Sequence, residues 1–251
     1  MGIDACVTQE EQVSVDLTSL PFFIPKRRKR RTDVAQFFQI HPNNPQGRLI
    51  RRSTEILNDN GLIVYPTDSG YALGCMLGNK KALDTMRAIR RLDEDHHMSL
   101  VCRNLTEIAT YAKLDNSAYR LIKAHTPGSY TFILTASREV PRRLQHPKRK
   151  TIGLRVPDNS IAQALLEELN APLLSTSLVL PEDDFPLTDP YDIRDTIGHQ
   201  VDLVIDGGYC GLETTTVVDF TSGEPYVTRQ GKGDSSAFTA AKTNLFEAGL
   251  S

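Results

Sequence analysis

The chain lacks the features that define several protein classes. It has no tryptophan, and its four cysteines are widely separated and form no C-x-x-C pair. A disulfide framework or a zinc knuckle is therefore not expected. No stretch approaches the ~18–20 consecutive apolar residues of a membrane span, and the first residues do not resemble a signal peptide. We expect a cytoplasmic protein with no membrane partner.

Common ligand-binding motifs are absent as well. There is no G-x-x-x-x-G-K-[ST] loop, no G-x-G-x-x-G after a strand and no G-x-S-x-G. P-loop, Rossmann and α/β-hydrolase interpretations lose their main support. No cluster of carboxylates suggests a resident metal, and the adjacent His96 and His97 would point in different directions on a regular element. We predict no metal site and no built-in cofactor.

The amino-acid balance is that of an ordinary globular protein, with 39% hydrophobic and 24% charged residues. A length of 251 residues suffices for one well-buried domain. The net charge of −2 gives no general attraction to nucleic acid, so RNA binding would need a local basic patch.

The two ends of the chain differ from its middle. Residues 1–33 lack helix or strand periodicity and contain the basic run Lys26–Arg31, so we predict a disordered basic extension. An alternative is that translation starts at Val34, because a bacterial GTG start codon is read as valine inside a longer reading frame. Residues 235–251 are predicted to form a loose, partly helical tail. The folded domain would span residues 34–234.

This middle part alternates apolar runs typical of strands with amphipathic segments typical of helices. Asn44 and Pro45 predict a helix start, and Pro66 is expected to end a buried strand. A helix is predicted over Pro190–Ile197, begun by Asp189. Closely spaced late strands favour a mixed sheet over a parallel one. They are predicted at Leu203–Asp206, Thr216–Asp219 and Tyr226–Arg229.

Six segments resemble, in order, the motifs of the YrdC superfamily, the threonylcarbamoyl-AMP synthases. Residues 66–74 match the signature P-T-[ED]-x-x-Y-x-L-G, and Gln36-Phe-Phe-Gln-Ile-His-Pro42 is similar to the YciO branch. The resemblance covers residues 37 to 233 and implies an α/β fold with an open, twisted mixed sheet and flanking helices. The other five segments are Thr126-Pro-Gly-Ser-Tyr-Thr131, Gly153-Leu-Arg-Val-Pro157, Asp206-Gly-Gly208, Thr215-Thr-Val-Val-Asp219 and Arg229-Gln-Gly231.

The family condenses threonine, bicarbonate and ATP into threonylcarbamoyl-adenylate for tRNA modification. The resemblance implies two groups of binding residues, with magnesium entering only with ATP and no catalytic residue assigned. A threonine-like substrate would contact Thr67, Tyr71, Thr131, Ser177 and Thr215, and nucleotide or phosphate would contact Arg90, Arg91, Arg155, Ser175 and Arg229. Structural alternatives stay open: Arg155 could pair with a carboxylate, and Thr67 and Thr215 could satisfy turn backbone.

Two departures from the family's motifs affect the expected chemistry. The synthases carry K-x-R where this chain has Arg90-Arg91-Leu92, and they carry S-x-N where it has Ser177-Leu-Val179. Leucine and valine cannot donate a hydrogen bond to phosphate or ribose. Losing one preorganised donor in a shielded site lowers a rate by ~10²–10³, so we expect altered or weakened synthase activity.

A second basic cluster follows residue 137, with six basic side chains in thirteen positions. Relatives resemble double-stranded-RNA binders with a concave basic surface, and this cluster would supply one edge of it. Such phosphate contacts are largely blind to sequence and weaken with salt. A solvated loop is the alternative. The cluster comprises Arg138, Arg142, Arg143, Lys148, Arg149 and Lys150.

Three functions therefore compete. The favoured one is a YciO-type protein that binds ATP or AMP and double-stranded RNA or tRNA, with weakened threonylcarbamoyl-adenylate chemistry. The second is an active synthase that uses Arg90 or Arg91 in place of the lost motif, with ATP, threonine and bicarbonate as ligands. The third is an RNA-binding module with a vestigial pocket.

Overall fold

The computed structural model describes residues 34–93, 96, 98–183 and 185–238. The extension predicted for residues 1–33 lies outside this range. Of the tail predicted for residues 235–251, the described part ends at Phe238, which is buried. Its ring lies 5.8 Å from that of Tyr130 and 6.4 Å from that of Phe132, so the chain is packed against the domain up to this residue.

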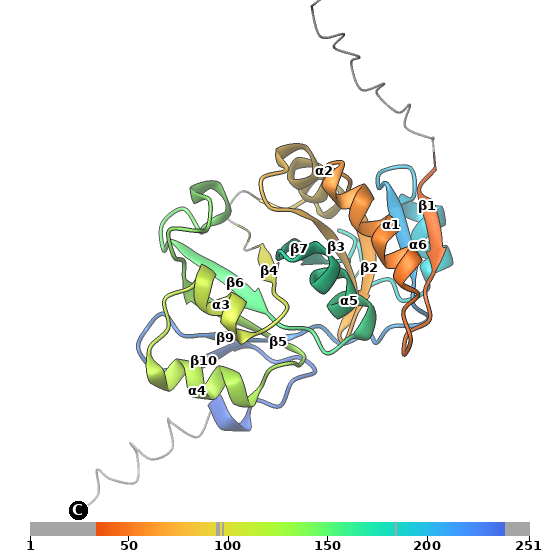
Figure 1. Ribbon diagram of the computed structural model, residues 1–251. Coiled ribbons are helices and arrows are strands. Elements are labelled where there is room, and N and C mark those ends of the chain that lie inside the picture. The colour runs from red at the N-terminus through yellow and green to blue at the C-terminus, as the bar shows by residue number, and fades with distance from the viewer. Residues whose placement is uncertain (1–33, 94–95, 97, 184, 239–251) are drawn as a thin grey trace, which may run out of the picture. The chain divides into compact units, whose positions relative to one another are not determined.

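Ten strands in the described part of the chain form one sheet, shown in Figure 1, in the order β1-β8-β2-β3-β7-β4-β6-β5-β9-β10. Four strand pairs are parallel and five are antiparallel, which confirms the predicted mixed sheet. The strands are β1 (Gln36–Gln39), β2 (Ile63–Thr67), β3 (Gly70–Met76), β4 (Ser99–Val101), β5 (Tyr130–Thr135), β6 (Thr151–Arg155), β7 (Leu173–Ser177), β8 (Leu203–Asp206), β9 (Thr216–Asp219) and β10 (Tyr226–Arg229).

Most helices begin at a short polar side chain that accepts a backbone N–H of the first turn. Asn79, Asn104, Asp115, Asn159 and Asp189 have this role, and Asp189 begins the helix predicted there. The helices are α1 (Gly47–Asn58), α2 (Lys80–Arg90), α3 (Leu105–Tyr111), α4 (Asn116–Ala124), α5 (Ser160–Leu169) and α6 (Pro190–Ile197), with a short 3₁₀ turn η1 (Arg142–Leu144).

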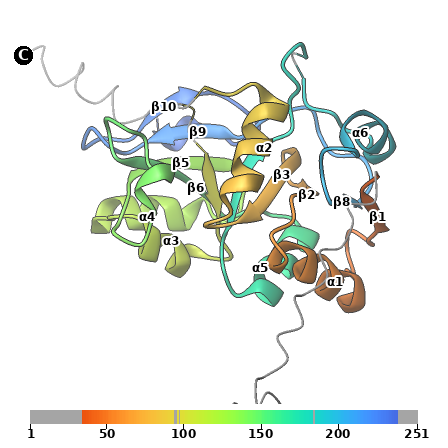
Figure 2. The same cartoon turned by 90° about the horizontal axis from the view of Figure 1, so that it is seen from above.

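Helices cover both faces of the β8-β2-β3 part of the sheet, as Figure 2 shows. On one face, Ile63 and Tyr65 of β2 pack in a cluster with α1 and α5. On the other, Leu62 and Val64 pack in a second cluster with α2 and α6. These alternating residues are all buried, because a central strand faces the core on both sides.

The predicted end of β2 was wrong, and β3 was not predicted. Pro66 does not end β2, because β8 pairs only with Ile63 and Val64, so no β8 residue needs the N–H that proline lacks. The strand β3 was missed because it contains Gly70 and Gly74. A Cβ on Gly74 would lie 2.7 Å from the Tyr65 ring, so this glycine permits a close approach inside the sheet.

The predicted start of α1 was also wrong, by about one half-turn. The helix begins at Gly47 after Gln46, because residues 41–46 form a turn closed by side chains. His41 Nδ1 accepts the N–H of Asn44 at 3.1 Å, and Gln46 Oε1 accepts the N–H of His41 at 3.1 Å. Asn44 is thus held in a turn before the helix.

Candidate functional site

A cleft of about 410 Å³ lies where α1 and α5 no longer cover the sheet, over β7, β4, β6, β5 and β9. Its lining is rich in hydroxyl groups and cations. The hydroxyl residues are Ser99, Thr131, Ser175, Thr176, Ser177, Thr214, Thr215 and Thr228, the cationic or titratable ones are Arg90, His96, Arg155 and Arg229, and the remainder are Ala72, Val101, Ile133, Gly153, Val179 and Val217.

The two-residue period of the strands positions this lining. Thr131 of β5 and Arg155 of β6 face the cleft, whereas the intervening Phe132 and Leu154 belong to the hydrophobic core. Gly153 forms part of the floor, and a Cβ there would lie 2.8 Å from Ser99 Oγ. The glycine of this predicted motif therefore leaves room between neighbouring hydroxyl residues.

The hydroxyl groups on the floor are joined in short networks. Thr131 Oγ1 and Thr215 Oγ1 lie 2.8 Å apart, and Arg229 Nη2 donates to the Thr215 carbonyl oxygen at 3.0 Å. Ser175 Oγ donates to a backbone carbonyl and lies 2.9 Å from the Tyr65 hydroxyl. Because Ser175 donates its hydroxyl proton to that carbonyl, the Tyr65 hydroxyl is the donor between the two, and burial raises the pKa of Tyr65 to about 12.

One end of the cleft gathers basic side chains, with no carboxylate among the described residues that line it. Arg90, Arg229 and His96 line it, and no aspartate or glutamate occurs among the described lining residues. Burial and the neighbouring Arg229 lower the pKa of Arg90, and burial with Arg90 and Arg229 lowers the pKa of His96. The buried Nε of Arg90 has no hydrogen-bond partner within the described chain. This end of the cleft would favour an anion.

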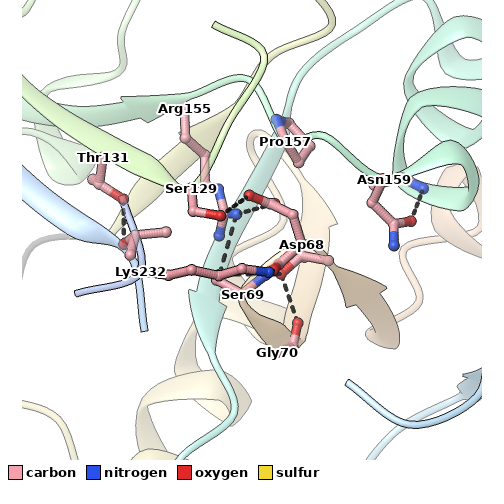
Figure 3. A network of polar contacts seen from close by, with 12 residues as sticks. Asp68, Ser69, Gly70, Ser129, Thr131, Arg155, Pro157, Asn159 and Lys232 are labelled. Carbon is pink, nitrogen blue, oxygen red and sulfur yellow. Dashed lines mark hydrogen bonds and ion pairs between the residues drawn. The ribbon is translucent and has the colours of Figure 1, made fainter. Parts of the chain in front are cut away.

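The end of the cleft next to the P-T-D-S-G turn is neutralised. Arg155 Nη2 donates to Asp68 Oδ1 at 2.5 Å, and Ser129 Oγ donates to Asp68 Oδ2 at 2.6 Å, as Figure 3 shows. Arg155 Nη2 also donates to Ser69 Oγ at 3.2 Å, and Lys232 Nζ donates to the Asp68 carbonyl oxygen at 2.5 Å. The side chains of Arg155 and Asp68 are each 6% exposed. Arg155 thus lines the cleft and also pairs with a carboxylate.

Three predicted site residues do not line the cleft. Thr67 is buried and donates to the Gly70 carbonyl oxygen at 2.6 Å, which closes the turn. The Tyr71 hydroxyl donates to a backbone carbonyl of the loop after β8 at 2.8 Å. Arg91 ends α2 with a φ of 47° and pairs on the surface with Glu182 at 3.2 Å. The other seven predicted residues converge on the cleft.

Sequence reasoning missed His96 and the Asp68 network. His96 follows the K-x-R position closely in the chain, and Asp68 is the acidic residue of the signature, so both could have been found by asking which polar residues border the motifs. The two departures from the family's motifs, Leu92 and Val179, lie in different surroundings. Val179 lines the cleft, whereas Leu92 packs against the hydrophobic core.

The predicted RNA-binding cluster lies on the loop that connects β5 and β6, with all six basic residues exposed. Two of them also hold the loop in place. Arg143 Nη2 donates to the Gly78 carbonyl oxygen at 2.7 Å, and Arg149 Nη1 lies 3.4 Å from the buried carboxylate of Asp219. The cluster is therefore an ordered basic surface with four further side chains pointing into solvent.

Searches of the described residues found neither a group of His, Cys, Asp and Glu side chains suited to a metal ion nor a helix that is long and apolar enough to span a membrane.

The chain is similar to a protein family and to individual proteins along most of its length. A family model described as "Telomere recombination", covering the Sua5, YciO and YrdC proteins, matches residues 55–231. An uncharacterized Haemophilus influenzae protein is 59% identical over 206 residues, which are 82% of this chain and all of the relative. Escherichia coli YciO is 55% identical, and its crystal structure superposes with a TM-score of 0.79 over 81% of this chain and 99% of that one.

More distant relatives include threonylcarbamoyl-AMP synthases. A threonylcarbamoyl-AMP synthase of Halorhodospira halophila is 29% identical over 170 residues, which are 67% of this chain and 88% of the relative. Pyrococcus abyssi Sua5, solved in complex with L-threonine, shares the fold with a TM-score of 0.71 at 23% identity, over 78% of this chain and 57% of that one. The chain therefore belongs to the Sua5/YciO/YrdC family, and its close relatives are YciO proteins.

Proposed function

We propose that the cleft binds ATP and threonine and that it makes threonylcarbamoyl-adenylate more weakly than the synthases do. The observation that carries this proposal is the cluster of Arg90, His96 and Arg229, which line the cleft with no carboxylate among the described lining residues. Unpaired cations in a partly buried site favour a polyanion such as the triphosphate.

The other half of the cleft suits a small zwitterion. The Arg155 guanidinium can meet a carboxylate, since its buried Nε has no partner in the described chain, and Asp68 beside it can attract an ammonium group. The paired hydroxyls of Thr131 and Thr215 can exchange hydrogen bonds with a hydroxyl side chain. The complex of Sua5 with L-threonine supports an amino acid of this kind.

Val179 is the reason for proposing weakened chemistry. It lines the cleft at the position where the family motif has asparagine, and its side chain cannot donate to the phosphate or ribose. Arg90, in contrast, keeps a cation at the lysine position. The cleft thus retains charge for binding but lacks one donor for positioning.

Calorimetric titration with ATP and threonine, separately and together in bicarbonate buffer, tests the proposal. Each ligand should strengthen the binding of the other, and pyrophosphate release from ATP should require both threonine and bicarbonate. Full synthase-like turnover would contradict the weakening, and no heat from either ligand would contradict nucleotide binding. Arg90→Met serves as the variant that should lose ATP but keep threonine.

We propose a second ligand, double-stranded RNA or tRNA, for the ordered basic loop. The side chains of Arg138, Arg142 and Lys148 are exposed and make no hydrogen bond or ion pair in the described chain, so they are available to phosphates. Their alanine variant should bind duplex RNA less tightly, with a log–log salt slope lower by about 0.9 per lost contact. The control replaces Lys113, Arg120 and Lys123, which are exposed around α4. Equal effects of the two variants would reduce the loop to a solvated surface.

A further inference from the structure

The strand β1 leaves one edge of the sheet open. Among the described strands it pairs with β8 alone. The N–H groups of Gln36 and Ile40 point toward β8, where they donate at 3.0 and 2.8 Å. By the two-residue alternation of a strand, the backbone groups of Phe37 and Gln39 point away from β8. Figure 1 shows β1 at the end of the sheet beside α1. An unpaired edge of this kind can accept another strand.

A groove of about 460 Å³ runs between this edge strand and α1. It forms because the buried side of α1 packs toward α5 and the central strands rather than over β1. Phe38 and Leu49 lie in the groove half-buried, so its floor is apolar. The groove lies on the α1 face of β1, which is also the face onto which alternate side chains of an added strand would project.

Three arginines line the groove at the N-terminal end of α1, where cations are unfavourable. Arg48, Arg51 and Arg52 occupy the first six residues of α1, whose first turn has no acidic residue. The partial positive charge of a helix N-terminus disfavours cations there. Arg52 pairs with Glu55 at 2.6 Å and Arg51 lies 3.7 Å from Glu168, both at exposed positions where ion pairs stabilise little.

The side chain of Arg48 forms no ion pair or hydrogen bond within the described chain. Local interactions therefore do not account for three cations at this helix end. Two of the arginines have only exposed ion pairs, and the groove keeps a net positive lining although Glu55 also lines it. A charge pattern that opposes a local rule in this way indicates a functional surface. The chemistry it favours is anionic.

We propose that an extended acidic segment of a partner protein adds to the free edge of β1 and places its carboxylates in this arginine groove. Backbone hydrogen bonds to Phe37 and Gln39 would give affinity, and carboxylates at alternate positions would meet Arg48, Arg51 and Arg52. The open strand edge and the apolar floor favour a peptide over a nucleic acid, whose phosphates would use the arginines alone. This site is separate from the cleft and does not depend on the function proposed for it.

A labelled peptide of alternating valine and glutamate, about ten residues long to match a long strand, is a direct probe. Fluorescence anisotropy with the full-length protein should show saturable binding. A peptide of the same composition with its glutamates in one block should bind less tightly, because it cannot place carboxylates at alternate positions. Replacing the three arginines with alanine should lower affinity by about tenfold or more, the effect expected for lost charge-assisted hydrogen bonds.

Gln39→Pro separates strand addition from simple charge attraction. Proline removes the outward N–H but no hydrogen bond to β8, and Gln39→Ala is its matched control because it removes the same side chain and keeps the N–H. We expect binding in the alanine variant and loss of binding in the proline variant, with equal unfolding midpoints. Equal affinities of the two variants, no peptide binding at all, or displacement of the peptide by duplex RNA would overturn the proposal.

Discussion

The two ends of the cleft use arginine in opposite ways. At the turn after β2, Arg155 is 6% exposed and its charge is matched by Asp68 at 2.5 Å, with Ser129 completing the carboxylate's hydrogen bonds. At the far end, burial lowers the pKa of both Arg90 and Arg229, the charge of Arg229 lowers the pKa of Arg90 further, and no carboxylate of the described lining balances them. The charge of the first arrangement is balanced within the fold, although the buried Nε of Arg155 has no partner in the described chain, whereas the charge of the second is not balanced there.

This difference distinguishes an arginine whose charge is paired within the fold from arginines whose charge is left for a ligand to pair. A buried pair such as Arg155–Asp68 fixes the geometry of the turn, and breaking it leaves a desolvated ion. An unpaired cation contributes little to folding and can cost stability, because burial disfavours its charged form. The two arginine types should therefore respond oppositely when they are replaced.

The largest effect is expected for Asp68→Ala. The substitution leaves the Arg155 guanidinium buried without its partner, which typically costs about 3–5 kcal/mol of unfolding free energy. Urea unfolding measures it. The double variant Asp68→Ala, Arg155→Met should regain much of this loss, because no buried charge remains. A loss below about 1 kcal/mol in the single variant would show that the pair behaves like a surface ion pair.

A restored donor at Val179 should give the next largest effect. Val179→Asn returns an amide to the cleft wall, and one preorganised donor is worth about 10²–10³ in rate. Threonine-dependent pyrophosphate release should rise toward that range. Val217→Asn, which adds an amide elsewhere in the lining, is the control. Equal gains in both variants would mean that polarity, and not the position of the donor, limits the reaction.

Leu92 offers no such restoration. Its side chain packs against the hydrophobic core, so Leu92→Arg would bury a charge rather than deliver one to the cleft. The alignment of motifs alone treats Leu92 and Val179 as equivalent losses. Their different surroundings could be recognised only once the loop after α2 had been placed.

Arg90→Met tests the end of the cleft where arginine has no carboxylate partner in the described lining. Methionine keeps the apolar stem and removes a charge that makes no hydrogen bond in the described chain, so stability should change little or rise. ATP affinity should fall by about 1.5–3 kcal/mol, the value of a hydrogen bond to a charged group. Arg91→Met, at an exposed position outside the cleft, is the matched control and should bind ATP normally.

The fold was largely predictable because its elements carry strong local signals. Asp189 begins α6 as predicted, and the three late strands have the predicted bounds. The strand β3 was not predicted because two of its residues are glycines, which are uncommon in strands. Gly74 leaves room for the Tyr65 ring, and Gly70 adopts a φ of 131° that other residues rarely reach. Such contacts join separate segments and leave no periodic signal.

The site residues likewise fall into those that local motifs predicted and those whose roles depend on distant segments. Thr131, Thr215 and Arg229 were expected from their motifs and do converge on the cleft. The roles of Asp68 and Lys232 were not expected, because the residues they contact are distant in the sequence. His96 enters the sequence predictions only as half of a metal pair that is rejected because His96 and His97 are adjacent. Its environment is made by α2 and β10, and only the tertiary structure brings these together.

The smallest effect is expected for His96, and it concerns pH. Burial, Arg90 and Arg229 lower its pKa in the folded protein below the ordinary value of 6.5, with Arg87 acting in the same direction and Asp93 against it. Below pH 6.5 the unfolded chain therefore binds a proton that the folded chain resists. Stability should fall as the pH drops through this region, and His96→Asn should remove that part of the fall.

The same histidine should make ATP binding dependent on pH. A bound triphosphate offsets the charges of Arg90 and Arg229 and so raises the pKa of His96, which then takes up a proton on binding. The affinity of the wild type relative to His96→Asn should increase from pH 7.5 to pH 5.5, by at most about tenfold per pH unit for one linked proton. Comparing the two proteins cancels the titration of ATP itself. A constant ratio of affinities would mean that His96 does not sense the ligand and that the anion-binding end of the cleft consists of Arg90 and Arg229 alone.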